Sequence, residues 1–497
     1  MATQSDRTEV IKSVEPTNLS FGPPAAERDQ ALFDCFVASE SFKSVRHGGK
    51  TVILGNRGSG KSAIFLKLKQ EEERASNIVI SLAPEEYSYE MFCQVLAKEG
   101  EGAWAKHGAY AAAWKFLIYV LIMKRVTSTG PSLKTGAAAS IYKYLRDNHS
   151  VDTNPIGILI SYMKRLEVLK VGQFEARARE LQKLYKLEEI ASLIPELERV
   201  CQRRSVFVLI DELDKGWDNS EDAKAFVAGL FQAALSINAR GKGIRVLISL
   251  RKELYDNIPE LYEDAQKVRD LIETLEWDEP ALLELIAKRI RNSLSSSEKM
   301  SPEKSWNLVF SETLDYRKTR SFNYIVDRTL YRPREIIQFC NTIRDIAVEK
   351  HKMCPLDYQI IAESEYAYSE SRLQDIAAEY RFQYPGLLSV FGTFRGREYN
   401  LLREDLEEHV LKISTGESPI DEAAETWCKE ADPEFMIDTL WKVGFLRAQA
   451  VGGLRARRRS GSSYLGPHQV SSLNLRNITR FHVHPMFRSF LAMKEAK

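Results

Sequence analysis

The segment "GNRGSGKS" (Gly55–Ser62) constrains the fold of this 497-residue chain more than any other feature, because it satisfies the pattern G-x-x-x-x-G-K-[ST] without a mismatch. An apolar segment at 51–54 precedes it, and the segment 62–75, rich in helix-forming residues, follows it. A strand, a glycine-rich loop and a helix are therefore expected in succession. Glycines let such a loop curl until its N–H groups point inward, towards a bound anion.

The chemistry that this loop serves is phosphate binding, since the N-terminus of the following helix adds its positive end. Lys61 is expected to reach the β- and γ-phosphates of ATP, and Ser62 to ligate Mg²⁺. The alternative is a chance glycine loop. The predicted ATP-binding residues are Gly55, Asn56, Arg57, Gly58, Ser59, Gly60, Lys61, Ser62 and Ala63.

A second apolar segment, Val206–Ile210, runs directly into a cluster of acids. We predict a buried strand beside the strand that precedes the loop, with Asp211 holding Mg²⁺ through water. Glu212 is the predicted general base, which polarises the attacking water, and Asp214 is a candidate for either role. The alternative is an acidic turn that faces solvent.

Apolar segments alternate with helix-like segments as far as residue 277, which predicts an α/β protein with a parallel sheet. We expect a polar tail at 1–28, a P-loop core at 29–277, a helical lid at 278–352 and a winged-helix-like domain at 353–497. A long helical insertion, at about 87–204, separates the two motifs. Within it, the apolar run Phe116–Met123 is far shorter than the roughly 20 residues of a membrane span, so a buried or amphipathic helix is expected.

Composition excludes several classes of protein. The net charge of +1 gives no overall preference for nucleic acid or membrane. The six cysteines are scattered without C-x-x-C spacing, which argues against a zinc ribbon or a disulfide framework and fits a reducing cytoplasm. The first residues lack the apolar core of a secretory signal, so a cytoplasmic location is expected.

The loop together with "LIDELDKGW" resembles the ORC/Cdc6-like branch of AAA+ ATPases and the related STAND NTPases of bacteria. The resemblance implies that Arg251, after the strand "VLISLR", senses the γ-phosphate, with Ser249 as the other candidate. It also implies that Arg269 lies where an arginine finger completes a neighbour's site, which requires an oligomer. Arg334, in "RPREIIQF", is placed as the second sensor on the lid. For each arginine the alternative is a surface charge.

The C-terminal segment has the order helix, strand, arginine-rich loop and strand, which suggests a winged helix. Its wing would contact double-stranded DNA through phosphates, using Arg455, Arg457, Arg458 and Arg459. The preceding helix carries Asp432, Glu434 and Asp438, which argues against reading of base edges. Contact with a protein, or a loop that is merely solvated, are the alternatives.

Together these features predict an ATP-hydrolysing switch or motor that engages DNA or a partner effector protein. Bacterial relatives of this type suggest anti-phage defence or mobile elements by resemblance only. The alternative is a STAND-like signalling scaffold with little turnover, which binds a protein through its helical insertion. The sequence has no evident nuclease or protease motif, so a partner chain would supply any such activity.

Overall fold

The computed structural model describes residues 14–83, 103–128, 136–148, 187–213, 219–258, 261, 268–295, 300–429, 431–449, 464–467, 469–470 and 473–495. The chain divides into two compact units. We call Ala38–Glu276 the sheet unit, and Met1–Val37 with Trp277–Lys497 the C-terminal unit.

The sheet unit is built on five parallel strands in the order β2-β3-β4-β1-β5. They are β1 (Val52–Gly55), β2 (Ile78–Leu82), β3 (Val206–Ile210), β4 (Ile244–Arg251) and β5 (Ile272–Thr274). Almost every residue of β1, β3 and β4 is buried, as expected for parallel strands that are covered on both faces. The predicted α/β fold with a parallel sheet is confirmed.

The neighbour of the loop strand was predicted wrongly: β4, not β3, pairs with β1. Ile248 of β4 is in register with Val52 on one side and with Ile210 on the other. The strand β4 is the longest of the five, and six of its eight residues are buried, as expected for a strand flanked on both edges. The acids that follow β3 therefore lie one strand further from the loop than expected.

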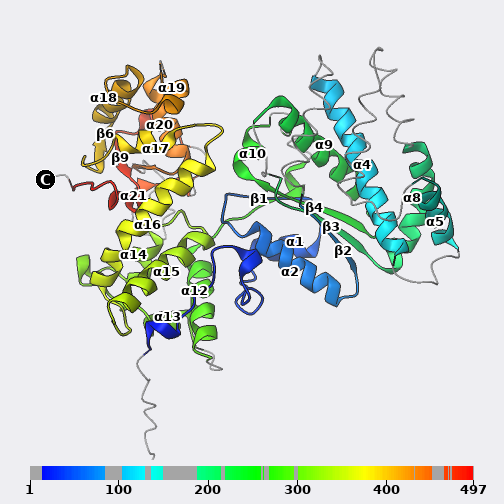
Figure 1. Cartoon of the computed structure of the whole chain (residues 1–497), viewed down its shortest axis with the longest axis horizontal. Helices are drawn as coiled ribbons and strands as arrows, with labels where there is room; N and C mark the ends of the chain where they lie inside the picture. Colours follow the sequence, from blue (N-terminus) through cyan, green and yellow to red (C-terminus); the bar gives the residue numbers. More distant parts are fainter. Residues whose placement is uncertain are drawn as a thin grey trace, which may run out of the picture. The chain divides into compact units, whose positions relative to one another are not determined.

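Helices cover both faces of this sheet (Figure 1). They are α1 (Glu40–His47), α2 (Lys61–Arg74), α4 (Ala103–Thr127), α5 (Ala137–Asn148), α8 (Leu187–Arg203), α9 (Glu221–Asn238) and α10 (Lys252–Asp256). Figure 1 shows α1 and α2 on one side of the strands and α4 and α9 on the other.

The predicted helical insertion contributes directly to the core. Trp114 of α4 donates its indole N–H to the carbonyl of Phe226 in α9, at 3.2 Å. Side chains of α4, α8 and α9 share one apolar cluster with the strands. Within the described residues, no helix is long and apolar enough to cross a membrane. The run at 116–123 is thus a buried helix, as predicted.

The C-terminal unit begins with lid helices and ends in a small antiparallel sheet of order β6-β9-β7-β8. The lid helices are α12 (Glu279–Ser293), α13 (Pro302–Asn307), α14 (Ser321–Val326) and α15 (Pro333–Glu349), and the predicted winged-helix-like domain begins with α16 (Tyr358–Glu379). The following elements are α17 (Leu387–Gly392), β6 (Asn400–Leu402), α18 (Arg403–Ser414), α19 (Glu422–Cys428), α20 (Pro433–Lys442), β7 (Leu446–Gln449), β8 (Tyr464–Leu465), β9 (Arg480–Val483) and α21 (Pro485–Arg488). This order agrees with the predicted winged helix. The lid and the winged helix share one hydrophobic core.

The expected polar tail differs from the structure over residues 14–28, which we call the strap. Leu19 and Phe21 are buried in the core of the C-terminal unit. Phe21 stacks on Phe310, and Asp29, just beyond the strap, forms a buried ion pair with Arg289 of α12 at 2.6 Å. Val14 also packs against this core and Pro16 is buried, so several apolar residues hold the strap, and they cover apolar surface of the lid helices.

Candidate functional site

The phosphate loop has the backbone that its glycines predict. Gly58 and Gly60 adopt left-handed φ values of 81° and 98°, which disfavour any side chain. Gly60 is the N-cap of α2 and has no side chain with which to cap the helix. The N-terminus of a helix is a place where proteins bind anions.

Lys61 lies folded over this loop. Its Nζ donates to the carbonyl oxygens of Gly55 at 2.7 Å and Asn56 at 3.1 Å. A Cβ at Gly55 would lie 2.3 Å from Oγ of the buried Ser59, so a larger residue there would force the Ser59 side chain to move. The amine thus lies at the loop itself, which is where a phosphate-binding lysine is needed.

The acids after β3 lie at the carboxyl edge of the sheet. The backbone N–H of Asp211 donates to the carbonyl of Leu82 at 3.0 Å, which extends the pairing of β3 with β2 by one residue. Glu212 has a left-handed φ of 60°, and its N–H donates to Oδ1 of Asp211 at 2.9 Å. Asp214 lies outside the described residues. Carboxylates at this edge are suited to a hard cation such as Mg²⁺.

Arg251 ends the strand between the loop and the acids. It is in register with Gly55, the first residue of the loop. Ser249, two residues earlier, is buried, and its Oγ has no hydrogen-bond partner among the described residues. Gly55, Asp211 and Arg251 therefore occupy the carboxyl ends of three neighbouring or near-neighbouring strands, the edge at which open α/β sheets bind ligands.

The other two predicted arginines lie elsewhere. Arg269 is exposed and begins a short 3₁₀ turn (Arg269–Leu271) before β5. Arg334 belongs to the C-terminal unit, and its Nε donates to the carbonyl of Pro24 in the strap at 3.3 Å. Their roles as finger and sensor remain predictions.

Sequence reasoning missed the arginine beside Arg334. Arg332 is only 5% exposed, and its Nη1 lies 2.8 Å from a carboxylate oxygen of Glu379 in α16. It also lies near Glu335, whose Oε2 accepts from the N–H of Leu330. Arg332 therefore ties the start of α15 to α16. The proline that follows it, at the start of a helix, was the available signal.

The predicted wing arginines lie outside the described residues. The acids of α20 are described, and each is engaged locally. Glu434 pairs with Arg476 at 2.8 Å and Asp438 pairs with Lys442 at 2.5 Å. Asp432 caps the helix through the N–H of Glu434. The repulsion expected between this helix and phosphates is therefore reduced.

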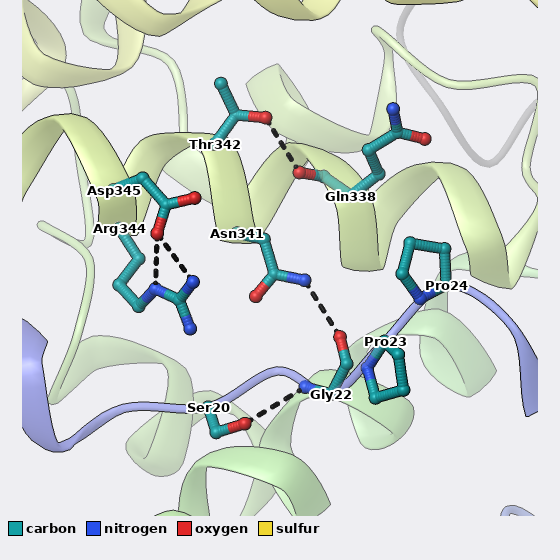
Figure 2. A pocket seen from close by; sticks show the side chains of 9 residues that line it. All are labelled: Ser20, Gly22, Pro23, Pro24, Gln338, Asn341, Thr342, Arg344 and Asp345. Atoms are coloured by element: carbon teal, nitrogen blue, oxygen red, sulfur yellow. Dashed lines mark hydrogen bonds and ion pairs between the residues drawn. The ribbon is translucent and has the colours of Figure 1, made fainter. Parts of the chain in front are cut away.

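A cavity of about 460 Å³ lies within the C-terminal unit, away from the phosphate loop in sequence. Figure 2 shows the strap on one side of it and α15 on the other. Asn341 Nδ2 donates to the carbonyl of Gly22, and Arg344 pairs with its neighbour Asp345. The lining residues are Ser20, Gly22, Pro23, Pro24, Gln338, Asn341, Thr342, Arg344 and Asp345. No group of three or more potential metal ligands occurs in the described part of the chain.

Comparison with known proteins finds similarity in both units. Residues 280–377, from α12 into α16, match the family model described as "FunZ-associated C-terminal helical domain". The chain is 24% identical to the "Putative transposon gamma-delta 80.3 kDa protein" of Escherichia coli (strain K12), over 96% of this chain and 68% of that protein.

Among solved structures, the chain matches that titled "Structure of the Aeropyrum Pernix ORC2 protein (ADPNP-ADP complexes)". The identity is 10% and the TM-score 0.31, with 94% of this chain and 99% of that chain covered, and a likeness this loose supports no statement about ligands. The chain is thus similar over most of its length to a putative transposon protein, and its lid helices match the FunZ-associated C-terminal helical domain.

Proposed function

We propose that this chain binds Mg²⁺–ATP at the loop 55–62 and hydrolyses it. The observation that carries the proposal is the convergence at one sheet edge of the glycine loop that begins α2, the Asp211 carboxylate and Arg251. In P-loop enzymes these positions supply phosphate binding, metal binding and charge stabilisation.

Each residue then has a distinct task. Lys61 exchanges its two loop carbonyls for phosphate oxygens, and Ser62 and Asp211 hold the metal. Bound Mg²⁺ supplies charge neutralisation at the phosphates. Glu212 takes the proton of the attacking water, and Arg251 stabilises the charge that develops on the γ-phosphate.

The proposal also assigns roles to the two remaining arginines, Arg269 and Arg334. Arg269 serves as a finger for a neighbouring copy in an oligomer, and Arg334 contacts nucleotide from the lid. Hydrolysis would then change the relation between the two units and switch their engagement of DNA or of a partner effector protein. The name of the relative supports a role in mobile-element biology; a role in anti-phage defence rests on the sequence resemblance alone.

One observation favours a second candidate, a nucleotide-held switch with little turnover. Glu212 has a left-handed backbone that non-glycine residues rarely adopt, at the position required of the general base. If that conformation persists with ATP bound, water is not polarised and ATP is simply retained.

Two measurements on the full chain test the proposal: ATP affinity from a fluorescent analogue, and phosphate release. Lys61→Ala should lose affinity for ATP. The control is Lys67→Ala, which removes a lysine of the same helix that bonds Gln70, and its affinity for ATP should be unchanged. Equal affinity in Lys61→Ala and the parent would refute nucleotide binding at this loop. Tight binding without release in the parent would select the switch with little turnover.

A further inference from the structure

One face of the winged-helix sheet is not used by any part of the proposed function. Side chains alternate along strands, and the register places Asn400 beside His482, Leu402 beside Arg480 and Gln449 beside Tyr464. We call this the outer face; its members are Asn400, Leu402, Arg447, Gln449, Tyr464, Arg480 and His482. The opposite face, which includes Phe481 and Val483, is buried in the core.

The outer face carries positive charge and no carboxylate. The strands β6, β7, β8 and β9 contain two arginines and a histidine but no aspartate or glutamate. At one end Arg447 is buried and pairs with Asp327 at 2.7 Å, so its charge does not face solvent. At the other end Arg480 is exposed, and its cross-strand neighbour Leu402 is 47% exposed.

Aromatic rings form a stack on the same face. The rings of Tyr464 and His482 are parallel, with centroids 3.2 Å apart and an interplanar angle of 17°. Tyr399 meets His482 edge-on, and the Arg488 guanidinium lies 3.8 Å from the centroid of the Tyr399 ring. Burial, together with nearby Arg488 and Arg447, lowers the pKa of His482 to about 3, so its ring is neutral at physiological pH. Tyr464 is the half-buried outer member of this neutral stack.

Flat rings beside an exposed arginine are features by which proteins bind unpaired bases. A duplex does not offer its base faces, because they are stacked on one another inside the helix. The carboxylates of an acidic peptide would pair with Arg480 but would not stack on rings. The ring stack therefore favours a single strand of nucleic acid over an acidic peptide.

We propose that the outer face binds a single strand of nucleic acid, with one base stacked on Tyr464, the adjoining phosphate paired with Arg480 and the neighbouring base in contact with Leu402. This site lies wholly in the C-terminal unit and is separate from the ATP site. It also differs from the predicted contact between the wing and duplex phosphates.

Fluorescence anisotropy of labelled oligonucleotides tests the proposal on the full chain, using oligo-deoxythymidine and oligo-uridine of about 16 nucleotides and a duplex of equal length. Tyr464→Ala should weaken single-strand binding roughly five- to 100-fold, and Tyr464→Phe, which keeps the ring, should retain it. Arg480→Ala should weaken binding and lower the salt dependence of log K by about 0.7. Tyr366→Ala, which removes a 52% exposed tyrosine of α16, is the matched control and should bind like the parent.

Several results would overturn the site: no binding of either single strand by the parent, equal binding by Tyr464→Ala, or a Tyr464→Phe variant as weak as Tyr464→Ala. Tighter binding of the duplex, with the same dependence on Tyr464, would also overturn it. A preference for the deoxy or the ribo strand supports the site and identifies the sugar. Thermal unfolding shows whether Tyr464→Ala is folded. If it is not, Arg480→Ala still tests the site, because Arg480 is exposed and its removal does not disturb the core. ATP affinity, measured on the same samples, separates failure here from failure of the proposed ATPase.

Discussion

Substitution of Asp29 by alanine tests most directly whether the strap is part of the C-terminal unit. The side chains of Asp29 and Arg289 are 2% and 5% exposed, and their charged atoms lie 2.6 Å apart. Arg289 also donates through Nη1 to the carbonyl of Phe21 in the strap. Arg289 therefore holds α12 both to the strap, through Phe21, and to the residue that directly follows it, Asp29.

The expected cost follows from this burial. Removal of one partner of a buried ion pair costs about 3–5 kcal/mol, because the other charge stays buried without compensation. Glu495→Ala is the control, since its pair with Arg317 is 55% exposed on both sides and solvent screening leaves such a pair little stability to lose. Gly22→Ala should disturb the same contact, because φ is +77° and a Cβ would lie 2.1 Å from Nη1 of Arg289.

Hydrogen exchange followed by mass spectrometry suits the assay, because it reports each unit separately. If α12 opens together with its unit, Asp29→Ala should speed exchange of peptides within 282–293 by roughly 100- to 4,000-fold, the factor that corresponds to 3–5 kcal/mol. Peptides of β3 and α9, in the sheet unit, should be unchanged. If the α12 peptides exchange no faster in Asp29→Ala than in Glu495→Ala, the reasoning is refuted, and residues 14–28 do not stabilise the C-terminal unit.

Further expectations concern the site and pH. Lys61→Ala should weaken ATP binding about ten- to 100-fold relative to Lys67→Ala, the value of a hydrogen bond to a charged group, as read by a fluorescent analogue. Glu212→Gln should retain ATP and slow phosphate release roughly 10²- to 10⁴-fold; unchanged release would remove Glu212 as the base. Chelation of Mg²⁺ by EDTA should abolish release in the parent, and restoration by excess Mg²⁺ is the control. Burial, and then nearby Arg397 and Lys412, lowers the pKa of His409 to about 4 from 6.5. Since the unfolded chain binds the proton more tightly, stability should be full above pH 6.5 and fall by about 3 kcal/mol towards pH 4, a loss that His409→Gln should remove from the pH series.

The sequence by itself determined the local chemistry of the phosphate site. The left-handed Gly58 and Gly60, and Lys61 at the start of α2, follow from a pattern that spans eight residues, so no distant contact is needed to place them. The pattern of apolar residues was likewise sufficient to predict the parallel strands and the helix around Phe116–Met123, because buried residues recur at a spacing set by the strand or helix that contains them.

Only the tertiary structure decided which segments became neighbours. The acids after Val206–Ile210 suggested that β3 lies beside β1, yet β4 takes that place, because no local pattern in the sequence specifies which parallel strands pair. Leu19 and Phe21 looked like isolated apolar residues in a tail, and their burial depends on lid helices more than 260 residues away, as the Arg289–Phe21 contact shows. The ring stack of Tyr464 on His482 was equally invisible, because antiparallel register brings together residues that no local pattern relates.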